Sequence, residues 1–343
     1  MQQQIADLAA STEPGRLGIL HLKRYWQKSM LLRNGQLAQD TYTDEWSIDN
    51  TLLNVLGLGL EQTLTHLYQT APSFEAFENW ILDINNGQLA EDKIGQFNRL
   101  VKGEAPVTTD HIDDTAPALS EDDLAFWETN GYVIVRNAVP KEDCEEAVKV
   151  ICDHIDIDRD DPSTWYNPHA ARQGIMVQLF QHSILEKNRN SQKIRNAFEQ
   201  LWGRKDIWLN TDRVGFNPPE TATWKYPGDK IHWDVSLQLP IPFGTQGILY
   251  LAGTQENQGA FSLVPGFQHK IEEWINALPP GADPRQEDMY ALGVKPIAAN
   301  AGDFIIWHHA LPHGSSPNTA TLPRYVQYIN YKPADMVHRK TWK

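Results

Sequence analysis

The 343-residue sequence predicts an α+β protein in which a helical N-terminal segment precedes a strand-rich region. Two observations predict this class. Residues 1–102 carry apolar side chains at mixed three- and four-residue steps, which is the spacing of one helix face. From about residue 205 onward, short β-branched or alternating stretches are separated by Pro and Gly, which is typical of a barrel or a sandwich.

The helical segment contains two clear blocks. The first holds an apolar series: Leu52, Leu53, Val55, Leu56, Leu60 and Leu64. The second begins at Ser73, a predicted N-cap, and presents Phe77, Trp80 and Ile81 on one face. We therefore predict a helical accessory domain over residues 1–102. The roles open to it are dimerisation, covering a substrate entrance, or docking a carrier protein, and we favour the first two.

Residues 103–119 are acidic, contain two prolines and lack apolar periodicity, which predicts a linker. The third domain, residues 120–343, opens with a short helix that Ser120 and Asp123 cap and that stops at Gly131. A strand-like stretch follows, and then an amphipathic helix that starts near Pro140.

The predicted strands of this domain share short length and flanking turn residues. They are expected within residues 206–216, 230–239, 247–253, 259–265, 303–311 and 324–331.

Composition excludes several classes of function. Lys and Arg number 30 and Asp and Glu 44, which gives a net charge of −14, so binding to a phosphate backbone is not expected. No apolar run reaches the length of a membrane span, and the N-terminus does not resemble a signal peptide. The two cysteines, Cys144 and Cys152, lie too far apart within one predicted helix to form a disulfide. These features predict a cytoplasmic protein.

Three His-x-Asp triplets occur, and they begin at His111, His154 and His232. The first falls in the predicted linker and the second at a helix end, where residues two apart point in different directions. The third falls on a predicted strand, where alternation places two sets of side chains on opposite faces. One face is polar and comprises His232, Asp234, Ser236 and Gln238. A polar face in such a strand indicates a wet or metal-containing cavity.

An imidazole and a carboxylate are two of the three ligands in a 2-His-1-carboxylate facial triad, which leaves positions open for a co-substrate and O₂. The second imidazole must come from another strand. Residues 302–318 offer His308, His309 and His313.

Here the sequence resembles the phytanoyl-CoA dioxygenase-like branch of the Fe(II)/2-oxoglutarate oxygenases. The resemblance covers residues 120–335 and rests on an ordered set of motifs: HWD at His232, a PG turn at Gly266, GD at Asp303, HGS at His313, Asn318, and Arg324 eleven residues after His313. It implies a double-stranded β-helix, also called a jelly roll or cupin-like core, with flanking helices.

The resemblance also implies the site. The iron ligands would be His232, Asp234 and His313, because His313 alone of the three candidate histidines has Ser at +2 and Arg at +11. Arg324 and Ser315 would bind the distal carboxylate of 2-oxoglutarate.

Three further residues are candidates for contacts around the same site. Tyr250 would line the co-substrate pocket or belong to the core, and Asn217 would hydrogen-bond the co-substrate or form a turn. Gln238 is a candidate contact for the substrate.

The implied cofactors are Fe(II), 2-oxoglutarate and O₂, and the implied reaction is hydroxylation of an unactivated C–H bond with release of succinate and CO₂. Related halogenases have Gly or Ala at the position of Asp234, so the carboxylate favours hydroxylation over chlorination. Desaturation and ring formation stay open.

Two readings from other classes stay open as well. One is a non-catalytic ligand-binding barrel. The other is a Zn²⁺ hydrolase, although no Glu general base adjoins the triad. The substrate is expected to be a small amino-acid-like molecule or a secondary metabolite, and the net charge weighs against a CoA thioester.

Overall fold

The structure is a computed structural model and describes residues 8–38, 41–104, 117–228 and 231–339. The chain divides into two compact units. Unit 1 comprises Met1–Thr115 together with Asp206–Asp212 and Lys332–Lys340, and unit 2 comprises most of the remainder. Residues 105–116 of the predicted linker, with His111, lie outside the described residues.

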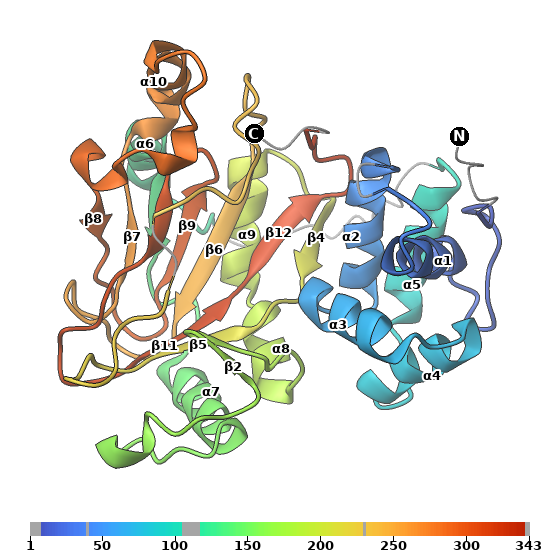
Figure 1. Cartoon of the computed structure of the whole chain (residues 1–343), viewed down its shortest axis with the longest axis horizontal. Coiled ribbons are helices and arrows are strands. Elements are labelled where there is room, and N and C mark those ends of the chain that lie inside the picture. Colours follow the sequence, from blue (N-terminus) through green and yellow to red (C-terminus); the bar gives the residue numbers. More distant parts are fainter. Residues whose placement is uncertain (1–7, 39–40, 105–116, 229–230, 340–343) are drawn as a thin grey trace. The chain divides into compact units, whose positions relative to one another are not determined.

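Unit 1 is built mainly from α-helices (Figure 1). They are α1 (Leu22–Arg33), α2 (Trp46–Val55), α3 (Leu60–Thr70), α4 (Phe74–Ile84) and α5 (Glu91–Val101). The leucine series 52–64 spans two of them, because the chain turns at Gly57, whose φ is +63°, and α3 starts after Gly59. Ser73 caps α4 as predicted, and Phe77 and Ile81 are fully buried in a cluster of apolar side chains.

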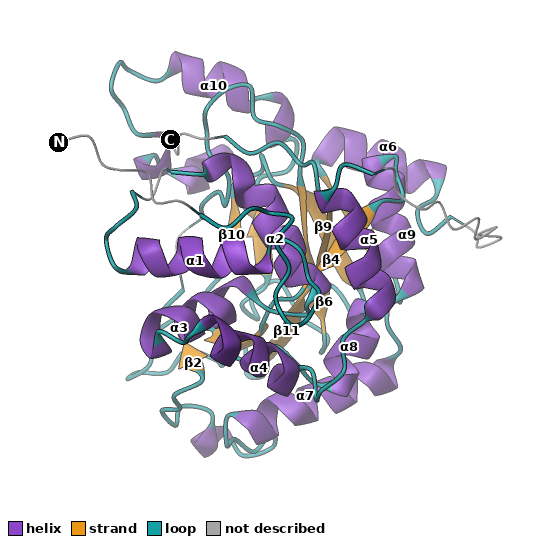
Figure 2. Cartoon of the chain, turned by 90° about the vertical axis from the view of Figure 1, so that its right-hand side faces the viewer, coloured by secondary structure: helices purple, strands orange, loops and turns teal. Residues whose placement is uncertain are grey.

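Unit 2 holds two antiparallel sheets (Figures 1 and 2). The larger runs in the order β1 (Tyr132–Val135), β9 (Phe304–His308), β6 (Thr245–Tyr250), β11 (Arg324–Tyr328), β5 (Val214–Asn217), β3 (Met176–Val177) and β2 (Arg172–Gln173). The smaller runs in the order β10 (His313–Ser315), β7 (Phe261–Leu263) and β8 (Lys295–Pro296). β4 (Ile207–Asn210) pairs with β12 (Asn330–Pro333) in a separate ribbon.

The described residues of unit 2 contain five α-helices, of which the first two were predicted and begin and end close to the predicted positions. They are α6 (Glu121–Asn130), α7 (Lys141–His154), α8 (Ser183–Arg189), α9 (Gln192–Trp202) and α10 (Ile271–Ala277). Ser120 and Asp123 form the predicted capping box, and Gly131 ends α6 in the left-handed conformation. Short 3₁₀ turns are η1 (Thr43–Glu45), η2 (Pro162–Thr164), η3 (Phe267–His269), η4 (Pro284–Gln286) and η5 (Met289–Leu292).

The prediction of a strand over residues 230–239 is wrong. Among the described residues 231–239, only His232 makes a ladder-type pair, an isolated bridge to His313. The expected alternation also ends early, since Ser236 is buried and accepts a hydrogen bond from the backbone of Gln238. The stretches 206–216 and 324–331 each contain two strands instead of one.

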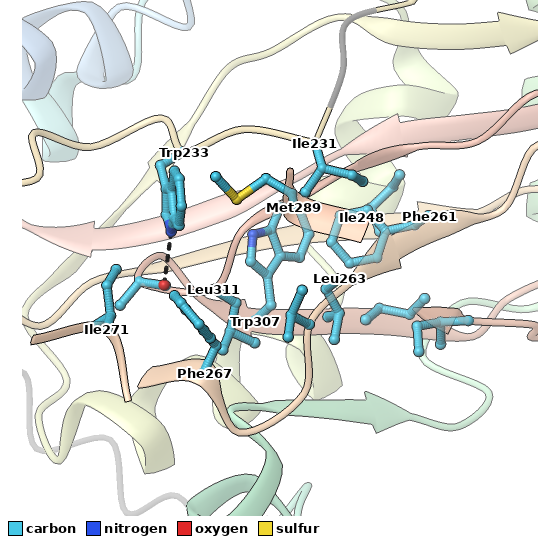
Figure 3. Close-up of a cluster of buried hydrophobic side chains, with 14 of the residues drawn as sticks. Ile231, Trp233, Ile248, Phe261, Leu263, Phe267, Ile271, Met289, Trp307 and Leu311 are labelled. Carbon is cyan, nitrogen blue, oxygen red and sulfur yellow. Dashed lines mark hydrogen bonds between the residues drawn. The ribbon is translucent and has the colours of Figure 1, made fainter. Parts of the chain in front are cut away.

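The core of unit 2 lies between the two sheets. Phe261 of β7 packs against Trp307 of β9 with ring centroids 4.2 Å apart (Figure 3). Ile248 of β6 and Leu263 of β7 belong to the same buried cluster. The residues of the metal centre described below lie beside this core. No helix within the described residues is both long and apolar enough to cross a bilayer.

Candidate metal centre

The two predicted imidazole ligands are brought together by the backbone. His232 and His313 exchange both N–H···O hydrogen bonds, with N–O distances of 2.8 and 2.9 Å. In an antiparallel pair of this kind the two side chains leave the chain side by side. Their ring centroids are accordingly 5.1 Å apart.

Asp234 completes the group. Its Oδ1 lies 3.4 Å from Nε2 of His232, and its Oδ2 lies 3.3 Å from Nε2 of His313. One ligand atom from each of the three residues lies within 4.8 Å of the others. Partial burial favours the neutral acid, but hydrogen bonds and charge from the two imidazoles outweigh it and hold the pKa of Asp234 well below its usual range.

The ring of His313 is oriented for ligation. Its Nδ1 lies 3.0 Å from the carbonyl oxygen of Leu311 and donates to it, so Nε2 is the ring nitrogen directed at the centre. Trp307 and Phe261 pack around the ring, with centroids 5.1 and 6.0 Å away. The carboxylate of Asp234 is by contrast 52% exposed.

Because the segment around Asp234 is not a strand, other contacts hold it. The indole Nε1 of Trp233 donates to the carbonyl oxygen of Ala310 over 2.9 Å (Figure 3). Arg285, on η4, donates from Nη1 to the Trp233 carbonyl over 2.8 Å and from Nη2 to the Val235 carbonyl over 2.6 Å. One guanidinium therefore hydrogen-bonds the backbone on both sides of Asp234 and fixes its position.

Gln246 on β6 is a contact of the site that the sequence reasoning missed. Its Nε2 donates to Oδ2 of Asp234 over 2.7 Å. The signal was available: side chains alternate along a strand, so Gln246 and Ile248 share a face with Tyr250, which the sequence analysis did select.

Arg324 and Ser315, the two residues predicted to bind the carboxylate of 2-oxoglutarate, lie together. Ser315 follows His313 by two residues on β10, so their side chains share a face about 7 Å apart. Nη1 of Arg324 donates to Oγ of Ser315 over 2.8 Å. Arg324 is completely buried, and its Nε and Nη2 have no hydrogen-bond partner among the described residues. Two unpaired buried donors of a planar cation match a carboxylate.

Asn217 lies directly opposite Arg324 in the β5–β11 pair and is fully buried. Its Nδ2 already donates to the carbonyl of Ser316 over 3.2 Å, while its Oδ1 has no partner within the described residues. As the side chain stands, Asn217 offers the site an acceptor. Asn318 is also buried and ties its loop together by donating to the carbonyls of Asn217 and Leu322.

The hydroxyl of Tyr250 already makes two hydrogen bonds within the protein. It donates to the carbonyl of Ile297 over 2.8 Å and accepts from the backbone N–H of Phe261 over 2.9 Å. Burial raises the pKa of Tyr250 to about 12, although the nearby Arg324 opposes this. Only its ring is left to face a ligand. Gln238 is half-buried in the segment that follows Asp234.

The two other histidines of the predicted ligand region stand apart from the triad. Burial lowers the pKa of His308 to about 3 and that of His309 to about 4, so both are neutral. Nδ1 of His308 accepts from the backbone of Ala310 over 3.0 Å, and Nε2 of His309 contacts the carbonyl of Pro242.

The GD motif has a structural role. Asp303 is buried, accepts from the backbone of Asn137 over 2.9 Å and pairs with Arg136 over 2.8 Å. Gly302 has a φ of +86°, and a Cβ there would come within 2.3 Å of the Val139 carbonyl oxygen. The motif therefore fixes the start of β9.

A second cluster of possible ligands occurs in unit 1 and comprises His21, Glu45 and Asp49. Lys28 lies between its two carboxylates and Arg24 pairs with Glu45. Cationic side chains thus already neutralise these acids. In contrast, the His232–Asp234–His313 group fits Fe(II), because two imidazoles and one carboxylate meet there and the unpaired donors of Arg324 suit the carboxylate of 2-oxoglutarate.

Comparisons with known proteins agree with this chemistry. The family model for phytanoyl-CoA dioxygenase matches residues 127–326. A curated protein of Dictyostelium discoideum named "Putative phytanoyl-CoA dioxygenase" is 24% identical over 270 residues, which covers 62% of this chain and 75% of that protein.

Two solved structures illustrate the structural likeness. The GlcNAc Inducible Gene 2 protein of Candida albicans is 13% identical with a TM-score of 0.50, and the alignment covers 65% of each chain. HygX of Streptomyces hygroscopicus, solved with nickel and 2-oxoglutarate bound, is 14% identical with a TM-score of 0.45, over 65% of this chain and 90% of that one. At 13% identity the likeness to the Candida protein concerns the fold alone.

Proposed function

Because the chain belongs to the phytanoyl-CoA dioxygenase family, we propose that it is an Fe(II)- and 2-oxoglutarate-dependent oxygenase. We further propose that it hydroxylates an unactivated C–H bond of a small amino-acid-like or secondary-metabolite substrate. The observation that carries the proposal is the combination of a His-Asp-His group with a fully buried guanidinium that has two unpaired donors.

When bound, Fe(II) with 2-oxoglutarate and O₂ supplies an oxidant that removes hydrogen from carbon, with succinate and CO₂ as co-products. In this proposal His232, Asp234 and His313 would hold the metal. Arg324 binds the distal carboxylate of 2-oxoglutarate through Nε and Nη2, while Ser315 keeps the guanidinium in place through Nη1.

With iron bound, the carboxylate of Asp234 would fill a position that a halide would otherwise take, which supports hydroxylation over halogenation. Asp234 is also the most exposed member of the triad, so its side of the centre is where a substrate can approach. Desaturation or cyclisation starts with the same hydrogen removal and is the alternative outcome.

The test is anaerobic addition of Fe(II) and 2-oxoglutarate to the purified protein. A weak visible charge-transfer band is expected, and it should disappear in His313→Ala and in Asp234→Ala. A band that persists in both variants contradicts the ligand assignment. Succinate release in a screen against a metabolite library then tests turnover, and metal analysis with O₂ consumption separates iron chemistry from a zinc hydrolase. A non-catalytic binding barrel would form no succinate with any substrate of the library.

We also propose that the two sheets of unit 2 form a double-stranded β-helix and that residues 1–102 act as an accessory domain, either for dimerisation or as a lid. Cys144 and Cys152 are both free and buried, which supports a reducing compartment such as the cytoplasm. Light scattering of the full chain tests dimerisation, and a monomeric mass at micromolar concentration contradicts it.

A further inference from the structure

We propose that Gln246 is a positioning residue that holds the carboxylate of Asp234 so that only one of its oxygens faces the metal. The inference deepens the proposed function and rests on it, since it concerns how the same centre keeps positions open for 2-oxoglutarate and O₂.

The two carboxylate oxygens of Asp234 have different contacts. Oδ2 accepts from Nε2 of Gln246 over 2.7 Å and also lies 3.3 Å from Nε2 of His313, while Oδ1 lies 3.4 Å from Nε2 of His232 and has no contact with Gln246. The bond from Gln246 is the shortest of the three contacts and has a neutral amide as its donor. An oxygen engaged in this way is a poorer metal ligand than its partner. Oδ1 is therefore the oxygen presented to the metal.

The orientation of the amide follows from charge. The nitrogen of Gln246 must face Asp234, because an amide oxygen at 2.7 Å would repel the carboxylate. The other end of the amide, Oε1, is buried and has no hydrogen-bond partner within the described residues. Leaving that oxygen unpaired is unfavourable. The contact with Asp234 therefore determines how this side chain lies.

Gln246 and Arg285 constrain different parts of the same residue. Arg285 clamps the carbonyls of Trp233 and Val235 and so fixes the backbone of Asp234. The side chain still has rotamer freedom, because it is half exposed and its segment lacks strand pairing. Gln246 supplies the missing constraint from β6, a strand that is paired on both sides by β9 and β11.

The consequence concerns coordination number. A six-coordinate metal with two imidazoles and one carboxylate oxygen keeps three positions, two for chelating 2-oxoglutarate and one for O₂. If both oxygens of Asp234 bound, a fourth position would be taken and the O₂ position would be lost. Gln246 prevents this by occupying Oδ2.

The test uses Gln246→Leu, which removes the donor, and Gln246→Glu, which is nearly isosteric but replaces the donor with an acceptor. The matched control is Gln200→Leu on α9, where the amide bonds the backbone of Leu119 instead. Dissociation constants for Mn²⁺ and Co²⁺ are measured by titration without turnover. The visible spectrum of the Co²⁺ complex with 2-oxoglutarate reports coordination number.

We expect metal affinity to fall about 10-fold in Gln246→Leu and about 100-fold in Gln246→Glu, with an altered Co²⁺ spectrum in both and neither change in the control. Melting of the metal-free variants checks that each is folded. Affinities within about two-fold of the wild type and an unchanged spectrum in a folded variant overturn the inference. Failure of the proposed function looks different: the wild-type protein would then bind Co²⁺ but give no 2-oxoglutarate-dependent change in its spectrum.

Discussion

Replacing Arg324 by Met tests whether the buried guanidinium is the 2-oxoglutarate anchor. The side chain is completely buried, and Nε and Nη2 are unpaired. If both donate to the distal carboxylate, the variant loses two charge-assisted hydrogen bonds of roughly 1.5–3 kcal/mol each. A loss of at least about 3 kcal/mol raises the dissociation constant of 2-oxoglutarate at least about 100-fold.

Thermal unfolding measures this without turnover. With Mn²⁺ present and 2-oxoglutarate at about 100 times its wild-type dissociation constant, the wild-type protein gains about 2.7 kcal/mol of stability. Under the same conditions the Met variant gains at most about 0.4 kcal/mol. Arg324→Lys keeps the charge but lacks the planar fork, so it should fall between the two.

The control is Arg195→Met on α9, whose guanidinium bonds Glu199 and the backbone of Lys205 and should leave 2-oxoglutarate binding unchanged. An Arg324→Met protein that is folded and still shows the full stabilisation by 2-oxoglutarate would refute the assignment. The unpaired donors would then need another explanation.

Three further outcomes are expected. Ser315→Ala removes the acceptor of Arg324 Nη1 and should weaken 2-oxoglutarate binding about 10-fold, a net loss of roughly 1–2 kcal/mol in binding free energy. Calorimetry measures the affinity, and an unchanged value contradicts a role for Ser315. Burial raises the pKa of Cys144 to about 12 and also raises that of Cys152. The thiolate fraction of Cys144 at pH 8 is therefore on the order of 10⁻⁴. A thiol reagent should react with neither cysteine in the native protein and with both after unfolding. Deleting residues 1–115 should cause aggregation, because Trp208 of β4 packs against the apolar cluster of unit 1; a monodisperse product by light scattering would contradict this.

The sequence predicted most reliably where local chemistry decides structure. Ser73, the capping box at Ser120 and Asp123, and Gly131 were all placed correctly, because a cap depends on residues within one turn of each other. The core strands over 247–253, 259–265 and 303–311 were also identified from their composition.

The segment around Asp234 was predicted wrongly because its polar–apolar alternation imitates a strand. What holds it is distant in sequence: the bridge to His313, the Ala310 carbonyl and the fork of Arg285. The strand alternation could have singled out Gln246 as a neighbour of Tyr250, but its hydrogen bond to Asp234 joins two segments that no local pattern relates. The inclusion of residues 206–212 in unit 1 likewise could not be read from local pattern.

The pairing of Asp234 with His313 has a bearing on the resistance of the protein to unfolding. A metal ion bound by the triad would link Asp234 to His313, which lie 79 residues apart in the sequence. By the relation for covalent cross-links, closing a loop of that length removes about 4.5 kcal/mol of unfolded-chain entropy. The bound ion would thus stabilise the folded protein as a reversible cross-link. Removing it with a chelator would make the protein more sensitive to proteolysis and would also abolish the proposed oxygenase activity.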